Sequence, residues 1–88
     1  MPRKTHFLLA QIQTAFSDKT SLKTPYWTLF VEVENLYGIS QERVYAFSNL
    51  VPPTIIQTLQ TQAYQGKKYY LECEKRVRGW RLKNWKEI

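Results

Sequence analysis

Residues 43–80 read RVYAFSNLVPPTIIQTLQTQAYQGKKYYLECEKRVRGW, and this stretch decides the fold. Its side-chain pattern predicts a strand over 43–50, a helix over 54–64 and a second strand over 67–77. In the two strands, one set of alternate residues is apolar: Val44, Ala46, Tyr69, Leu71, Cys73 and Val77. The opposite set is aromatic and charged: Arg43, Tyr45, Phe47, Lys68, Tyr70, Glu72, Glu74, Arg76 and Arg78. We therefore expect a sheet with one buried face and one aromatic, basic face.

Turn chemistry sets the limits of the predicted helix. Val51-Pro52-Pro53 ends the first strand, because proline cannot donate to a central ladder. We expect Thr54 to act as N-cap and Gly66 to end the helix at C′. The apolar side of this helix comprises Ile55, Ile56, Leu59 and Ala63.

Working outward, YWTLFVEVE over 26–34 is the clearest strand, rich in β-branched and aromatic residues. Its Trp27, Leu29, Val31 and Val33 form a core face, and Tyr26 and Phe30 lie on the outer face. The other predicted elements are an arm over 1–5, strands over 6–16 and 80–88, a loop over 17–25, a turn over 35–42 and a tight turn at Arg78-Gly79. The two lysines of the loop either contact phosphate or are simply solvated. The order is strand, strand, strand, helix, strand, strand.

Length and charge narrow the class of protein. Eighty-eight residues form one domain, 1–88, too small for a deep catalytic cleft. The formal net charge is +6, with +3 over 1–24, −2 over 25–65 and +5 over 66–88. Because termini often meet in small domains, the two basic ends can form one patch. Such a patch points to a polyanion, nucleic acid first and anionic lipid second, unless the charge serves solubility alone.

Several kinds of chemistry have no counterpart in the sequence. Cys73 is the single cysteine, so neither an intramolecular disulfide nor a cysteine-based metal site can form within one chain. His6 is the sole histidine, and no nucleophile motif, phosphate loop or metal-ligand cluster accompanies it. Glu72 and Glu74 share the face of Arg76, and we expect them to balance neighbouring charge. We expect no enzyme, cofactor or metal. We also expect no membrane span or signal peptide, and hence a cytoplasmic protein.

Five strands with a helix between the third and fourth are the layout of an OB-fold barrel, an all-β fold. The central block, RVYAFSNL, a helical spacer and GKKYYLECEKRVRGW, resembles that of bacterial single-stranded-DNA-binding proteins. The positions that carry the resemblance are Arg43, Val44, Phe47, Ser48, Gly66, Leu71, Glu72, Arg76, Arg78 and Trp80. It covers about 38 of the 88 residues closely, and the rest only in layout.

The resemblance implies particular site residues. In that family a phenylalanine of strand three and a tryptophan after strand four stack on bases, which here implies Phe47 and Trp80. The implied backbone contacts are Arg43, Arg76 and Arg78. The aromatic and basic face adds to the single-stranded-DNA site Tyr45, Tyr70, Phe30, Lys68, Arg81 and Lys83. Trp27, on the core face of its strand, is a further candidate. Trp80 follows a turn, so it can equally pair inward with Leu82.

Departures from the family pattern shape the remaining expectations. Gln41 replaces the usual tryptophan, and the connection between strands four and five is short. We also expect no disordered tail with an acidic tip. In these respects the chain resembles the primosomal replication protein of the same superfamily, a short, tail-less dimer. We therefore expect a homodimer that binds single-stranded DNA in replication, repair or recombination, without acidic-tail recruitment of partners. The alternatives are an RNA-binding OB module and a protein-interaction OB module whose rings are buried against a partner.

Overall fold

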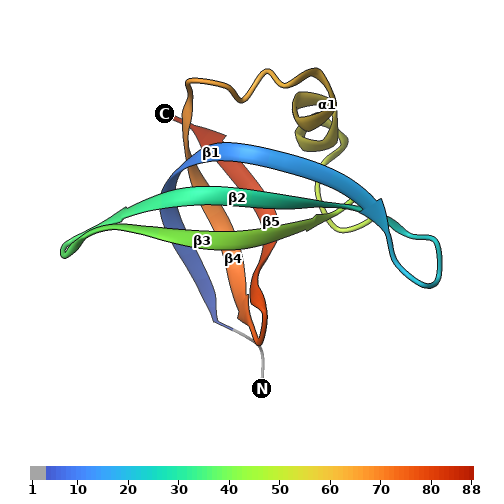
Figure 1. Ribbon diagram of the computed structural model, residues 1–88, viewed down its shortest axis with the longest axis horizontal. Helices are drawn as coiled ribbons and strands as arrows, with labels where there is room; N and C mark the ends of the chain where they lie inside the picture. Colours follow the sequence, from blue (N-terminus) through green and yellow to red (C-terminus); the bar gives the residue numbers. More distant parts are fainter. Residues whose placement is uncertain (1–3) are drawn as a thin grey trace.

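The computed structural model describes residues 4–88 as a closed barrel in which the strands neighbour one another in the order β1-β2-β3-β5-β4 (Figure 1). Its elements are β1 (Thr5–Lys19), β2 (Pro25–Asn35), β3 (Gly38–Phe47), α1 (Pro53–Thr61), β4 (Lys68–Arg76) and β5 (Gly79–Glu87). Only β3 and β5 pair in parallel; the other neighbours are antiparallel. The predicted five-stranded barrel with one short helix between strands 3 and 4 is confirmed.

β1 closes the barrel because it is long enough to pair on both sides. Its first half, 5–11, lies against β4, and 9–19 lies against β2. The register shifts between Ile12 and Thr14, which is a β-bulge that bends the strand from one partner toward the other. After the bulge, Phe16 points outward from the barrel wall and is 58% exposed.

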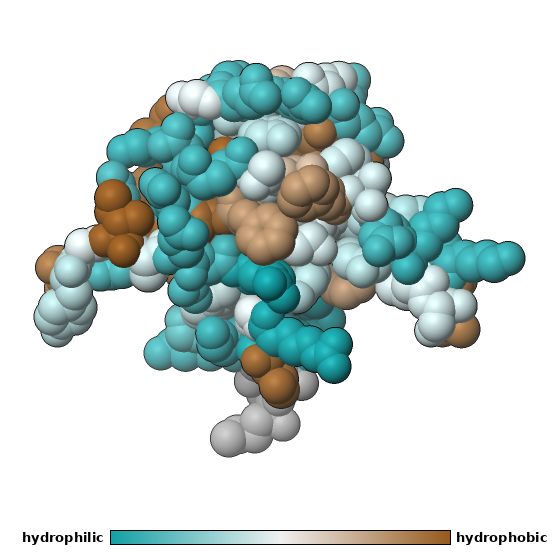
Figure 2. All heavy atoms as spheres, in the orientation of Figure 1, coloured by the Kyte–Doolittle hydropathy of each residue, from teal (hydrophilic) through white to brown (hydrophobic). Residues whose placement is uncertain are grey.

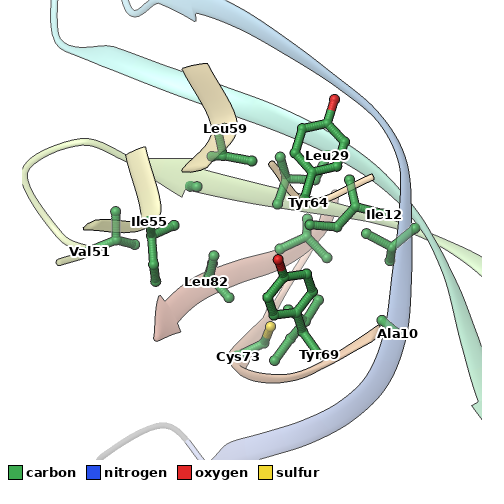
Figure 3. Packing of buried hydrophobic residues seen from close by; sticks show 14 of the residues in the cluster. Ala10, Ile12, Leu29, Val51, Ile55, Leu59, Tyr64, Tyr69, Cys73 and Leu82 are labelled. Atoms are coloured by element: carbon green, nitrogen blue, oxygen red, sulfur yellow. The ribbon is translucent and has the colours of Figure 1, made fainter. Parts of the chain in front are cut away.

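The core fills the barrel and is covered at one end by α1. The buried side chains include Leu29, Val44, Leu71 and Leu82, which have no exposed surface. Figure 3 shows Ile55 and Leu59 of the helix pointing into the interior among these strand residues. The predicted alternation of β3 and β4 is thus confirmed for Val44, Ala46, Tyr69, Leu71 and Cys73, all of which are buried.

Several predicted boundaries are wrong. Residues 17–19 continue β1 instead of opening the loop, and β3 begins at Gly38, so the turn between β2 and β3 contains only Leu36 and Tyr37. The helix has Pro52 at its N-cap position, with no side-chain capping bond, so Thr54 is not the cap. The helix ends at Thr61, followed by Gln62 as a left-handed C-cap with φ of 59°, so Gly66 is not the residue that ends it.

The connection between β4 and β5 also differs from its prediction. The turn is Val77-Arg78, and Gly79 already belongs to β5. Val77 was expected among the inward residues but is fully exposed, because a two-residue turn interrupts the alternation. The predicted arm 1–5 falls largely outside the described residues; its last residue, Thr5, begins β1. No helix within residues 4–88 is long and apolar enough to cross a membrane.

The buried thiol makes stability depend on alkaline pH. Burial raises the pKa of Cys73 from its ordinary value of 9.0 to about 12. An acid whose pKa is raised in the folded state stabilises the fold below its unfolded pKa, and this contribution is lost as pH rises between the two values. Because the thiol of Cys73 ionises in the unfolded state at pH 10, we expect it to lower the free energy of unfolding by about 1 kcal/mol relative to pH 7.

Urea denaturation at pH 7 and at pH 10 measures this loss. Burial also raises the pKa of Tyr69, which acts in the same direction, so Cys73→Ala serves as the reference. The variant should be less stable at both pH values but should lose about 1 kcal/mol less than the wild type between them. An equal loss in both proteins would contradict the assignment to Cys73.

Candidate nucleic-acid interface

Five aromatic rings lie together on the outer faces of β2, β3 and the second half of β1. Strand register places Tyr26 opposite Phe47, Thr28 opposite Tyr45, and Phe30 opposite Arg43. β1 adds Phe16 opposite Thr28 on the same side. We refer to the set Phe16, Tyr26, Phe30, Tyr45 and Phe47 as the ring face. Figure 2 shows apolar atoms gathered at the centre of this side of the molecule, with hydrophilic residues around them.

The rings form two neighbouring groups. Tyr26 lies between the other two rings of its group, 5.5 Å from Phe47 and 6.4 Å from Tyr45 between ring centroids. Phe16 and Phe30 meet edge to face at 5.9 Å. The guanidinium carbon of Arg43 lies 5.3 Å from the centroid of Phe30, within reach of a cation–π interaction. Arg43 and Phe30 therefore occupy one site, as the sequence analysis expected of two outer residues.

Beside the first group lies an open cleft of about 430 Å³, which we call the basic cleft. Its wall is made by β3 and by the β4–β5 turn, and its residues are Tyr45, Phe47, Arg76, Val77, Arg78 and Arg81. Five of these six are predicted site residues. β5 brings Arg81 level with Tyr45 through the parallel pairing of the two strands.

The cleft continues past Phe47 toward the loop between β1 and β2. A second hollow of about 350 Å³ shares Phe47 and Arg81 with the basic cleft and reaches Thr20, Leu22 and Leu50. The loop is held by its own hydrogen bonds: the Lys23 backbone N–H donates to the Thr20 carbonyl at 2.8 Å. The two hollows together extend across the barrel from the β4–β5 turn to the β1–β2 loop.

Trp80, the second ring implied by the family resemblance, lies outside the basic cleft. It is half-buried against the core, and its Nε1–H donates to Oε1 of Glu42 at 2.9 Å. His6 meets the ring edge to face at 5.2 Å, and the Lys75 ammonium nitrogen lies 4.7 Å from its centroid. The half-buried indole therefore has a hydrogen-bond partner and two ring contacts within the chain.

Four other predicted residues lie apart from the basic cleft. Trp27 packs on the core and lines a hollow beside α1. Tyr70 is exposed on β4, six residues from Arg76, which is roughly 20 Å along a strand. Lys68 pairs with Glu34 at 2.9 Å. Lys83 approaches the carboxylate of Glu74 at 3.9 Å, behind the cleft arginines.

The sequence analysis did not select Phe16, Tyr26 or Glu74 for the site. Tyr26 could have been found, because it has the same strand parity as Phe30. The outward direction of Phe16 could not have been predicted, because the bulge in β1 changes the alternation of side chains before this residue. Within residues 4–88, no group of three or more histidine, cysteine, aspartate or glutamate residues is placed to hold a metal ion.

Stacking rings beside guanidinium groups suit two parts of a polynucleotide at once. Every base offers a π-face to an aromatic ring, and a planar guanidinium can donate two hydrogen bonds to one phosphate. The outer face of strands 2 and 3, between the β1–β2 and β4–β5 loops, is also where OB-folds bind oligonucleotides and oligosaccharides. The ring face and the basic cleft lie in this place.

The fold of the whole chain is similar to that of a mitochondrial single-stranded DNA binding protein from S. cerevisiae, Rim1. The TM-score is 0.77, and the match covers 100% of this chain and 97% of that chain. Sequence identity is 13%, so this likeness concerns the fold. No protein-family model and no curated protein matches the sequence.

Proposed function

We propose that the protein binds single-stranded DNA without strong sequence preference, by stacking bases on the ring face and neutralising phosphates in the basic cleft. The observation that carries this proposal is the cleft itself, in which Tyr45 and Phe47 lie beside three arginines. The likeness in fold to a single-stranded DNA binding protein supports it. Rings without base-specific hydrogen-bonding groups around them accept any base, which accounts for the lack of preference.

The proposal assigns separate roles to the two groups of residues. Tyr45 and Phe47 stack successive bases, and Phe30 extends the platform toward Arg43. Arg76, Arg78 and Arg81 contact the phosphates that pass the β4–β5 turn. Membership of the bacterial single-stranded-DNA-binding family in its short form, a binding role without catalysis and a cytoplasmic location belong to the same proposal. So does a homodimer, which the exposed Phe7 on the outer side of β1 would suit.

Fluorescence polarisation with labelled oligo-dT, oligo-U and a duplex, at 50 and 200 mM salt, tests the function. We expect oligo-dT to bind more tightly than the duplex, because paired bases are stacked inside the helix and cannot reach the rings. The three arginine contacts to phosphate predict a slope of roughly −2 for log K against log salt concentration.

The other outcomes decide between the alternatives. Preference for oligo-U over oligo-dT would assign the protein to RNA. Binding to none of the three nucleic acids would overturn the proposal and leave the ring face as a protein interface, whose affinity should hardly depend on salt. Equal binding to duplex and oligo-dT would show that the arginines act without the rings.

A further inference from the structure

A carboxylate lies among the arginines of the basic cleft. Glu74 is in β4, on the outer face, and its side chain is only 12% exposed. Its Oε2 accepts from Arg81 Nη2 at 2.8 Å and from Arg76 Nη2 at 3.3 Å, and its Oε1 lies 3.9 Å from Lys83 Nζ. One carboxylate thus joins cations from two strands, and two of those cations line the cleft.

Strand register explains how this cluster forms. Glu74 pairs with Thr5 of β1 on one side and with Arg81 of β5 on the other, and Arg81 pairs with Tyr45 of β3. The carboxylate, the guanidinium and the ring therefore stand in one row across the barrel wall. A bulge at Lys83 lets its ammonium group reach Thr5 Oγ1 at 3.2 Å and approach the same carboxylate.

The geometry leads us to propose that Glu74 is a positioning residue: it binds one edge of the Arg81 guanidinium so that the other donors face phosphates in the cleft. A guanidinium carries five N–H donors, and Glu74 contacts it through Nη2, so donors remain for a phosphate. The 29% exposure of the Arg81 side chain shows that part of it stays accessible. This inference rests on the proposed function and adds a residue that touches no nucleic acid itself.

Glu74 has two opposite effects on DNA binding: it orients Arg81, and it reduces the positive charge of the cleft. Glu74 fixes the direction of Arg81, because a paired guanidinium loses much of its rotational freedom. It also cancels one positive charge next to the phosphate path. Removing the carboxylate should therefore increase the electrostatic attraction and weaken the control of geometry. A glutamate with a merely structural role would change stability and leave the number of phosphates neutralised unchanged.

Glu74→Gln separates these roles when oligo-dT binding is measured between 50 and 200 mM salt. We expect the slope of log K against log salt to become steeper by about 0.7, because the positive charge that Glu74 cancels beside the phosphate path would then act on the strand, with the effect of one more neutralised phosphate. We also expect the preference for oligo-dT over duplex to fall several-fold. An unchanged or shallower slope in a folded variant would overturn the inference.

Two further variants keep the test decisive. Glu87→Gln changes the net charge equally, but Glu87 pairs with Lys67 at 3.1 Å, six residues along β5 from Arg81, and should leave the slope unchanged. Arg81→Lys keeps the charge but loses the planar guanidinium that can donate two hydrogen bonds to one phosphate. We therefore expect several-fold weaker binding with an unchanged salt slope. Wild-type affinity for Arg81→Lys would overturn the inference even if Glu74→Gln fails to fold. If the wild type binds no oligonucleotide, the proposed function itself fails.

Discussion

Replacing Tyr45 and Phe47 together by alanine should weaken oligo-dT binding at least about 30-fold. Each stacked base contributes roughly 1–3 kcal/mol by alanine substitution, and 1.4 kcal/mol corresponds to a factor of ten. Both rings line the basic cleft and neither belongs to the buried core. The salt slope should be nearly unchanged, because the arginines remain. Fluorescence polarisation at fixed salt measures the loss, and a urea midpoint close to wild type shows that the fold is intact.

Tyr70→Ala is the matched control for this pair. Tyr70 has the same strand parity as Arg76 of β4 and is 48% exposed, but it lies opposite Leu9 and Lys86, away from the cleft. Its removal should change affinity by no more than ~2-fold. Comparable losses in Tyr70→Ala and in the double variant would show that bases follow another path over the barrel. No loss in the double variant would remove the ring face from the site.

Gly79→Ala should lower the free energy of unfolding by at least about 2–3 kcal/mol. Gly79 has φ of +145°, which side chains rarely adopt, and such strain costs of order 1–3 kcal/mol. A Cβ there would also lie 2.5 Å from the carbonyl oxygen of Arg43, so backbone of β3 or β5 must move. The clash falls where β5 approaches β3 to complete the barrel, next to the pair formed by Val44 and Trp80.

Gly38→Ala distinguishes the two causes. Gly38 has φ of +122°, and an added Cβ would meet no heavy atom within 4 Å. Gly38→Ala should therefore be destabilised by backbone strain alone, while Gly79→Ala should be destabilised by backbone strain and by the clash with Arg43. Urea denaturation of both variants gives the difference. Equal destabilisation would show that the approach of β5 to Arg43 does not limit the fold.

The fold was predictable because local patterns agree with one another. Strict alternation places Val44, Ala46, Leu71 and Cys73 in the core whatever the strand order is, and prolines separate β3 from the helix. The ends of elements were harder, since hydrogen bonds to neighbouring strands decide them. β1 runs to Lys19 because β2 offers it partners as far as Pro25. The residue types at 17–19 alone predict a loop.

The site was predictable in composition and less so in placement. Parity put Tyr45, Phe47 and Arg76 on one face, and the structure brings them into one cleft. Trp80 shows the limit of such reasoning, because its hydrogen-bond partner Glu42 is 38 residues away in sequence. The burial of Glu74 depends likewise on Arg81 and Lys83 of the adjacent strand. Contacts of this kind arise from strand order, which no local pattern contains.

Because β3 and β5 share only two residue pairs, the barrel wall has its shortest seam under the basic cleft. Each of the other neighbouring strand pairs shares seven or more. A polynucleotide that stacks on Phe47 of β3 and contacts Arg78 of the β4–β5 turn would cross this seam and bind to both sides of it. Ligand and fold would then be thermodynamically linked at one place: opening of the seam would release the ligand, and a bound ligand would suppress the opening.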